Sequence, residues 1–227
     1  MLKKWDALPD FMKNEYVKEY YMILSKKKIS LFVKRIFDIL LATVLLLVLL
    51  IPMLIISLMI KVDSKGPVFY RQERITTYGK KFKIHKFRTM VNHADSMGSS
   101  VTVDSDSRIT KVGSKLRNCR LDELPQLFDV FQGNMSFVGT RPEATEYVEK
   151  YLPEYYATLL LPAGITSQAS IHFKDEAKML KDVLNPDDIY IEDILPQKMK
   201  YNLESIKSFS VFDDLKTMIQ TVIAILK

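Results

Sequence analysis

One long apolar stretch limits the structures that this chain can adopt more than any other feature. Residues 36–60 are 25 positions whose only polar side chains are Asp38, Thr43 and Ser57. A helix rises about 1.5 Å per residue, so this stretch is long enough to cross a hydrocarbon core of roughly 30 Å. A cleaved signal peptide is a poor interpretation, because a long polar and aromatic stretch precedes the apolar one. We therefore expect a membrane helix.

Two features of the stretch favour a helix that bends and returns to the same side. Pro52 removes a helical hydrogen bond and crowds the preceding turn, so we expect a bend there. Asp38 lies close to Lys34 and Arg35, which makes a paired, interfacial carboxylate acceptable. Basic residues flank both ends, which suits a re-entrant helix: Lys26, Lys27, Lys28, Lys34 and Arg35 before it, and Lys61, Lys65, Arg71 and Arg74 after it. A spanning helix with a proline kink is the alternative that these features leave open.

Composition and charge limit the kinds of partner that the rest of the chain is expected to bind. The 227 residues are 48% hydrophobic and 26% charged, which is typical of one globular domain. The net charge of +6 favours an anionic partner such as a nucleotide, an acidic lipid surface or nucleic acid. No nucleic-acid-binding motif accompanies the charge, so nucleic acid is not expected. Cys119 is the single cysteine, which excludes an intramolecular disulfide and indicates a reducing, cytoplasmic environment.

The chain divides into three parts. We expect an N-terminal amphipathic helix in residues 1–31, the re-entrant helix in residues 32–62 and a folded domain in residues 63–227. Residues 68–75 and 82–87 read as strands of a short β-hairpin joined around Tyr78 and Gly79. Helical patterns follow in residues 114–117, 124–132 and 143–151, and an apolar helical face follows a capping box at Ser210. The predicted fold class is α+β, mainly helical.

Adjacent acids in residues 121–127 are the best candidates for chemistry. Asp122 and Glu123 precede Pro125, and this pattern fits a helix that begins at about Asp122. A charged helix cap is the simpler interpretation. The functional interpretation is a carboxylate held ionised near Arg117 and Arg120, where it can attack a phosphate. Such an attack requires Mg²⁺ and basic groups to neutralise the substrate, and basic residues at 86, 88 and 141 are further candidates.

Other polar groups support weaker hypotheses. Asp104 and Asp106 match the two-aspartate metal motif of many nucleotide-sugar glycosyltransferases, although an acidic surface loop is the favoured interpretation. His85, His93 and His172 lack the spacing of zinc ligands, so no zinc site is expected. The residues considered so far leave two functions open: a metal-dependent UDP-sugar glycosyltransferase that releases UDP, and a non-catalytic scaffold on a membrane surface.

Read in order, short motifs from about Lys34 to Gly164 match one family. The matching residues are Lys34-Arg35 with Asp38, Gly66-Pro67-Val68-Phe69 with Gln72 and Arg74, Gly79-Lys80 with Phe82, Lys86-Phe87-Arg88-Thr89-Met90, Asp106 with Arg108-Ile109-Thr110, Leu121-Asp122-Glu123-Leu124-Pro125-Gln126-Leu127 and Val138-Gly139-Thr140-Arg141-Pro142-Glu143. The chain thus resembles the bacterial sugar transferases, the monotopic phosphoglycosyl transferases that begin capsule, O-antigen and glycoprotein glycan assembly. Thr140, Asn134 and Ile51 depart from the usual pattern, and residues 167–202 differ from the common continuation.

The resemblance implies a fold, a reaction and a site. It implies a re-entrant membrane helix and a small catalytic domain on the cytoplasmic face of the bacterial inner membrane. The implied reaction moves a sugar 1-phosphate from a UDP-sugar to polyprenyl (undecaprenyl) phosphate with release of UMP, through a phosphosugar adduct on Asp122. Glu123 would assist, and both acids would hold Mg²⁺. The implied substrate-binding residues are Lys86, Arg88, Arg117, Arg120, Arg141 and Pro142.

Overall fold

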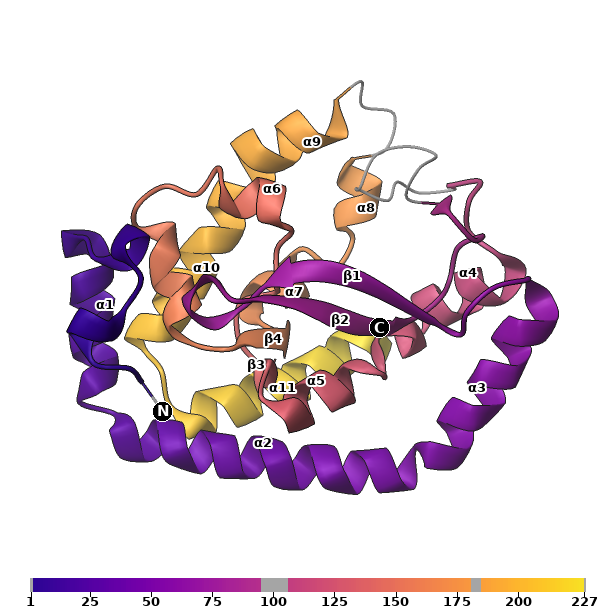
Figure 1. Ribbon diagram of the computed structural model, residues 1–227, viewed down its shortest axis with the longest axis horizontal. Helices are drawn as coiled ribbons and strands as arrows, with labels where there is room; N and C mark the ends of the chain where they lie inside the picture. The colour runs from indigo at the N-terminus through magenta and orange to yellow at the C-terminus, as the bar shows by residue number, and fades with distance from the viewer. Residues whose placement is uncertain (1, 95–105, 181–184, 227) are drawn as a thin grey trace.

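The computed structural model describes residues 2–94, 106–180 and 185–226. Its fold is mainly helical with two small two-stranded sheets (Figure 1). The strands are β1 (Phe69–Ile75), β2 (Lys81–Phe87), β3 (Met135–Val138) and β4 (Ala163–Thr166). The helices and helical turns are η1 (Trp5–Ala7), η2 (Asp10–Met12), α1 (Glu15–Ser25), α2 (Lys28–Val48), α3 (Leu50–Asp63), η3 (Thr77–Gly79), α4 (Lys111–Asn118), η5 (Leu121–Glu123), α5 (Gln126–Gln132), α6 (Thr145–Val148), η6 (Tyr155–Leu160), α7 (Gln168–His172), α8 (Glu176–Met179), α9 (Pro186–Ile189), η7 (Tyr190–Ile194), α10 (Leu195–Lys207) and α11 (Val211–Leu226).

The apolar stretch forms two helices with a bend between them. Helices α2 and α3 meet at an angle of 61°, and they run along the lower and right edges of Figure 1. No single helix in the described part of the chain is long and apolar enough to cross a membrane, whereas this bent pair meets that test when both halves are taken together. The break falls at Leu49, and Pro52 lies in the first turn of α3. Its ring excludes the carbonyl of the preceding turn, which explains a bend just before the proline.

Polar residues at the start of α2 attach this helix to the domain. Lys34 donates from Nζ to the Val138 carbonyl at 2.9 Å and to Asp214 Oδ2 at 2.6 Å. Asp38 is 3% exposed and accepts the main-chain N–H of Phe137 at 3.2 Å. The expected pairing of Asp38 with Lys34 or Arg35 is therefore wrong, because the carboxylate binds a main-chain N–H of β3. Its carboxylate is buried because the end of β3 supplies an N–H that needs a partner.

The predicted hairpin forms, and a second sheet lies beside it. Strands β1 and β2 pair antiparallel, with Phe69 opposite Phe87 and Arg74 opposite Phe82. Strands β3 and β4 pair in parallel, an arrangement that the sequence pattern did not predict. At the end of this pair, Gly139 and Gly164 touch so closely that a Cβ atom on Gly164 would lie 2.2 Å from the Gly139 nitrogen. Glycine at both positions therefore lets the two strands continue side by side.

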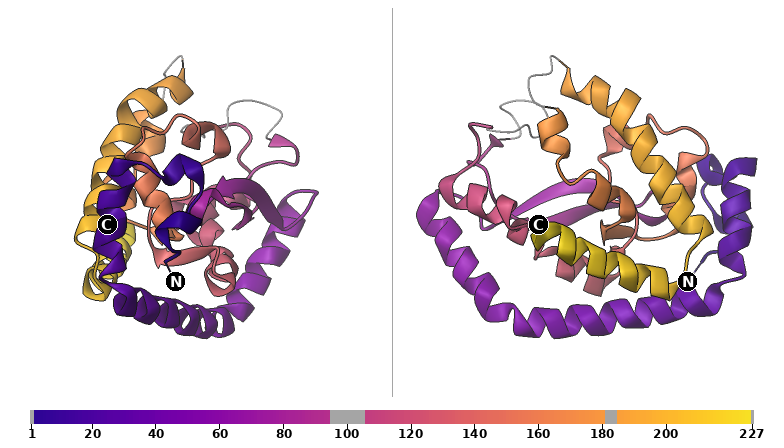
Figure 2. Two further views of the ribbon diagram at one scale, coloured as in Figure 1. Left: turned by 60° about the vertical axis from the view of Figure 1, so that its left-hand side comes forward. Right: turned by 180° about the vertical axis from the view of Figure 1, so that it is seen from behind.

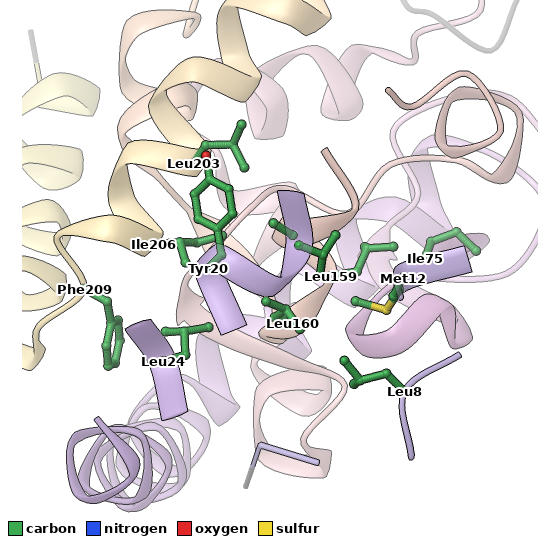
Figure 3. Close-up of a cluster of buried hydrophobic side chains, with 12 residues drawn as sticks. Leu8, Met12, Tyr20, Leu24, Ile75, Leu159, Leu160, Leu203, Ile206 and Phe209 are labelled. Atoms are coloured by element: carbon green, nitrogen blue, oxygen red, sulfur yellow. The ribbon is translucent and has the colours of Figure 1, made fainter. Parts of the chain in front are cut away.

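The N-terminal residues pack against the domain. Met12, Val17 and Tyr20 contribute to a buried apolar cluster together with Leu160 and Ile206 of η6 and α10 (Figure 3). The Tyr20 hydroxyl also donates to Glu154 at 2.7 Å. The views in Figure 2 place α1 against α10, at the opposite end of α2 from α3. The N-terminal helix α1 is therefore packed on the domain.

The last helix, α11, turns several of its polar side chains inward. Gln168 donates to Thr217 at 2.9 Å, and the hydroxyls of Thr166 and Thr221 lie 2.7 Å apart. The apolar side chains point outward and are exposed: Phe212, Leu215, Ile219, Val222, Ile223 and Ile225. A helix on the surface of a water-soluble domain normally shows the reverse pattern.

Candidate active site

Three separate segments bring acids and bases together at one place. Lys86 lies near the end of β2, Asp122 and Glu123 form the turn η5, and Arg141 follows β3. Helix α5 begins at Gln126 and not at the predicted Asp122, because Pro125 has no N–H with which to continue the helical hydrogen bonds. The two acids therefore lie in a tight 3₁₀ turn before the helix.

Glu123 is the centre of an ion-pair cluster. Its Oε1 atom lies 3.0 Å from Lys86 Nζ and 2.7 Å from an Arg141 terminal nitrogen, and its side chain is only 12% exposed. Burial favours protonation of Glu123, but the two cations more than offset it and hold its pKa well below the usual range. The same pairing with Glu123 raises the pKa of Arg141. Glu123 is therefore an ionised acid that orients two basic side chains.

Asp122 has a different environment from its neighbour. Its carboxylate makes no hydrogen bond or ion pair with any of the residues that the structure describes. Burial raises the pKa of the Asp122 carboxyl above its ordinary value, and the negative charge of Glu123 raises it further. The nearby cations Lys86, Arg117 and Arg141 oppose this rise. One acid of the pair is thus engaged with cations and the other is available to react.

The remaining predicted arginines occupy three different positions. Arg117 is half-buried and electrostatically coupled to Asp122, and among the described residues it has no hydrogen-bonded partner. Arg120 takes the left-handed conformation, with φ of 56°, and donates to the Lys174 carbonyl at 2.7 Å. Arg88 is 5% exposed and donates to three main-chain carbonyls after α3, those of Ser64, Lys65 and Pro67. The structure therefore places Arg117 at the acid pair and Arg120 beside it. Arg88 instead binds the main chain of the loop that follows α3.

Main-chain contacts fix the loop that carries Arg141 and the buried Pro142. The Gly139 nitrogen donates to the Thr166 carbonyl at 3.0 Å, and the Gly164 nitrogen donates to the Thr140 carbonyl at 2.9 Å. Two residues beyond Arg141, the Glu143 carbonyl accepts the Ile75 N–H at 3.0 Å at the end of β1. The position of the guanidinium is thus set by both sheets.

The second acidic motif does not join this cluster. Asp106 receives the Arg108 guanidinium at 2.6 Å, together with the Arg108 main-chain N–H at 3.0 Å. The guanidinium lowers the pKa of the Asp106 carboxyl. Asp104 lies outside the described residues. An aspartate occupied in this way by arginine is a poor metal ligand, which argues against the two-aspartate interpretation.

A divalent cation fits the acid pair only if the protein and the substrate both supply its ligands. The described residues contain no group of three or more His, Cys, Asp and Glu side chains placed to hold a metal. Mg²⁺ usually takes one or two protein carboxylates, and substrate phosphates and water complete its shell. Asp122 has a carboxylate available for this, whereas Glu123 already shares Oε1 between two cations. The predicted Mg²⁺ site is therefore compatible with the site, and it stays a prediction.

Sequence reasoning passed over one buried polar group at this place. Gln126 is 1% exposed and its side-chain nitrogen has no partner among the described residues. The sequence feature that could have identified Gln126 is its position directly after Pro125, within the motif that contains both acids.

Comparisons with known proteins agree with the motifs. A family model described as bacterial sugar transferase matches residues 29–227. A UDP-N-acetylgalactosamine-undecaprenyl-phosphate N-acetylgalactosaminephosphotransferase of Aeromonas hydrophila is 33% identical over 198 residues, which cover 86% of this chain and 44% of the relative. A UDP-glucose:undecaprenyl-phosphate glucose-1-phosphate transferase of Escherichia coli is 37% identical over 83% of this chain and 39% of its own length. The exopolysaccharide production protein PSS of Rhizobium leguminosarum is 34% identical over 86% of this chain and 96% of its own length. The chain therefore spans less than half of the first two relatives and aligns with nearly all of the third.

Proposed function

This chain belongs to the bacterial sugar transferase family, and from that membership we propose that it moves a sugar 1-phosphate from a UDP-sugar to a polyprenyl phosphate and releases UMP. Two of the relatives have names that describe transfer of this type to undecaprenyl phosphate. The observation that carries the proposal is the pair of adjacent acids, in which Glu123 binds two cations while the Asp122 carboxylate has no partner among the described residues. A nucleophile beside fixed cations suits attack on a phosphate.

The proposed reaction has two steps at one phosphorus atom. First, an Asp122 carboxylate oxygen attacks the phosphorus that carries the sugar, and the bond from that phosphorus to the oxygen bridging the two phosphates breaks. UMP leaves with the electron pair of that bond. A phosphate oxygen of the polyprenyl phosphate then attacks the same phosphorus, and Asp122 leaves as a free carboxylate. The product is a sugar joined to the lipid through a diphosphate.

The basic residues have separate roles in this scheme. Arg141 and Lys86 are held by Glu123 on one side of Asp122, where they can balance the charge of the donor phosphates. Arg117 is a further phosphate ligand, because its guanidinium lies near Asp122 without a hydrogen-bonded partner among the described residues. Bound Mg²⁺, with Asp122 as its protein ligand, would neutralise the diphosphate. Arg88 is left out of this set, because main-chain carbonyls occupy its guanidinium.

We also propose that the bent helices α2 and α3 enter and leave the membrane on the cytoplasmic side. Their outward faces are apolar and exposed, as at Leu47, Ile51 and Leu58. Helix α11 adds a further apolar face, while its Thr217 and Thr221 pair with groups inside the protein. Apolar faces of this kind suit a lipid surface. This placement brings a nucleotide from the cytoplasm and a lipid phosphate to the same site, as the first membrane step of a surface polysaccharide or glycoconjugate requires.

The nucleotide product tests the proposed function directly. The detergent-solubilised protein is incubated with undecaprenyl phosphate and a panel of UDP-sugars, and the nucleotides are separated by anion-exchange chromatography. We expect UMP, together with a phosphosugar adduct by intact mass when the acceptor is left out. Release of UDP would instead identify a glycosyltransferase and overturn the proposal, and the absence of any nucleotide product would favour a membrane-surface scaffold.

A further inference from the structure

A buried polar network joins the Arg141 loop to the C-terminal helices. Lys198 of α10 is 4% exposed, and its Nζ lies 3.0 Å from Glu176 Oε2 and 2.9 Å from the Tyr190 hydroxyl. The same nitrogen is 3.7 Å from Glu143 Oε1, and the Tyr190 hydroxyl donates to that oxygen at 2.6 Å. Glu143 follows Arg141 by two residues. Glu176 is thus connected, through one buried lysine, to the loop that holds the site's arginine.

A second contact ties the same segment to Arg120, which precedes the acid pair in the chain. Arg120, two residues before Asp122, donates to the Lys174 carbonyl at 2.7 Å. Two residues of chain span at most about 7 Å, so Glu176 lies within that distance of a residue in contact with Arg120. Residues 174–176 therefore link Arg120, which precedes Asp122, to the buried network that reaches the Arg141 loop.

Glu176 has both a fixed position and access to solvent. Its side chain is 29% exposed, whereas the lysine that holds it is 5% exposed. Its negative charge also acts on the Arg141 guanidinium and, after Glu123, contributes to the raised pKa of that arginine. Lys198 engages Oε2, and among the described residues Oε1 has no hydrogen-bonded partner. A fixed carboxylate with one available oxygen is a good acceptor for hydroxyl groups.

We propose that Glu176 is a specificity-determining residue that accepts hydrogen bonds from hydroxyl groups of the donor sugar. The inference rests on the proposed function and deepens it. When Arg141 and Asp122 hold the diphosphate, the sugar attached to it lies next to them, and residues 174–176 are tied to Arg120 on one side and to Lys198 on the other. Lys198 is a positioning residue in this arrangement, since its contacts to Glu176 and Tyr190 fix the carboxylate.

The test compares UDP-sugars that differ at one hydroxyl group. Glu176→Gln and Glu176→Asp are made in the full chain, with Glu192→Gln as the matched control, because Glu192 is an exposed acid of the same C-terminal region. The value of kcat/KM for UMP release is measured with UDP-glucose, UDP-galactose and their N-acetylated counterparts. The inhibition constant of UDP and the KM for undecaprenyl phosphate are measured alongside.

We expect Glu176→Gln to lower kcat/KM for the preferred sugar by about 10- to 100-fold, the loss typical of one charge-assisted hydrogen bond. The poorer sugars should lose far less, so the ratio between epimers should shrink. Glu176→Asp keeps the charge but shortens the side chain by one methylene group. The ratio of kcat/KM between epimers should therefore shrink in this variant too. The inhibition constant of UDP, the KM for the lipid and the control variant should stay at wild-type values.

Three outcomes would overturn the inference while leaving the proposed function intact. An equal loss with every UDP-sugar would mean that Glu176 acts only on Arg141. A weaker inhibition by UDP would place Glu176 at the nucleotide, and an unchanged kcat/KM with every UDP-sugar would remove it from recognition altogether. Failure of the wild-type protein to release UMP from any UDP-sugar would refute the proposed function and this inference with it.

Discussion

The ion pair between Lys34 and Asp214 offers the sharpest test of how helix α2 is joined to the rest of the fold. The two side chains are 8% and 17% exposed, and the atoms are 2.6 Å apart. Lys34→Met keeps the length of the side chain but removes the charge and the hydrogen bond to the Val138 carbonyl at 2.9 Å. Asp214 would then be a buried carboxylate without its cation.

The expected cost follows from this burial. Removing one partner of a buried ion pair costs about 3–5 kcal/mol, and the lost hydrogen bond adds about 1 kcal/mol. Protonation of Asp214 relieves part of this, so about 3 kcal/mol is a conservative expectation. For a domain of this size each kcal/mol corresponds to about 2–4 °C, which gives a decrease of about 6–12 °C in the unfolding midpoint.

The stability lost in Lys34→Met should also change with pH in a definite direction. Burial raises the pKa of Asp214 in the folded protein, and Lys34 opposes that rise. Without Lys34 the folded-state pKa rises further above the unfolded value, so the folded state holds a proton that the unfolded state has lost. Stability is then greatest below the ordinary aspartate pKa and falls as pH increases through the raised value. The loss of folding stability caused by Lys34→Met should therefore be smaller at pH 5 than at pH 8.

Thermal unfolding of the detergent-solubilised protein, followed by circular dichroism at both pH values, measures these effects. Lys28→Met is the matched control, because Lys28 is an exposed lysine on the same helix. The double variant Lys34→Met with Asp214→Asn should recover at least about 1 kcal/mol, since it removes the unpaired charge. A midpoint within 2 °C of wild type for Lys34→Met, or a double variant no more stable than the single one, would refute the reasoning.

Four further predictions concern the site and the membrane. Asp122→Asn should lower turnover at least about 10³-fold and abolish the adduct in intact-mass spectra, while Asp106→Asn keeps substantial activity; an adduct on the Asn variant would disprove the nucleophile. The pKa of Asp122 is raised by burial and by Glu123, so Glu123→Gln should move the acid limb of the rate of adduct formation to lower pH, and a shift to higher pH would contradict this. Chelation with EDTA should stop UMP release and Mg²⁺ should restore it; full activity in EDTA would exclude the metal. With the native cysteine replaced by serine, single cysteines near Lys4 and near Lys65 should both resist an impermeant maleimide in intact cells, and labelling near Lys4 would show a spanning helix instead.

Much of the fold followed from local chemistry. The β-hairpin was predictable because alternating side chains and the turn around Tyr78 and Gly79 act within a few residues. The bend between α2 and α3 followed from Pro52, although the break falls at Leu49, on the side where the proline ring crowds the chain. The acids next to Pro125 were visible in the sequence, but the residues alone favoured a charged helix cap, and the catalytic role came from the family resemblance.

The sequence alone thus determined which segments are apolar, where the chain turns and which acids lie at a turn. The tertiary structure decided which charges meet. Arg88 and Arg141 look alike as basic residues in motifs, yet one holds main-chain carbonyls and the other pairs with Glu123. The parallel pairing of β3 with β4 and the contact of Glu176 with Lys198 also join residues far apart in the chain. Local patterns report the hydrogen-bonding and steric needs of near neighbours, whereas the partner of a buried charge depends on how distant segments pack.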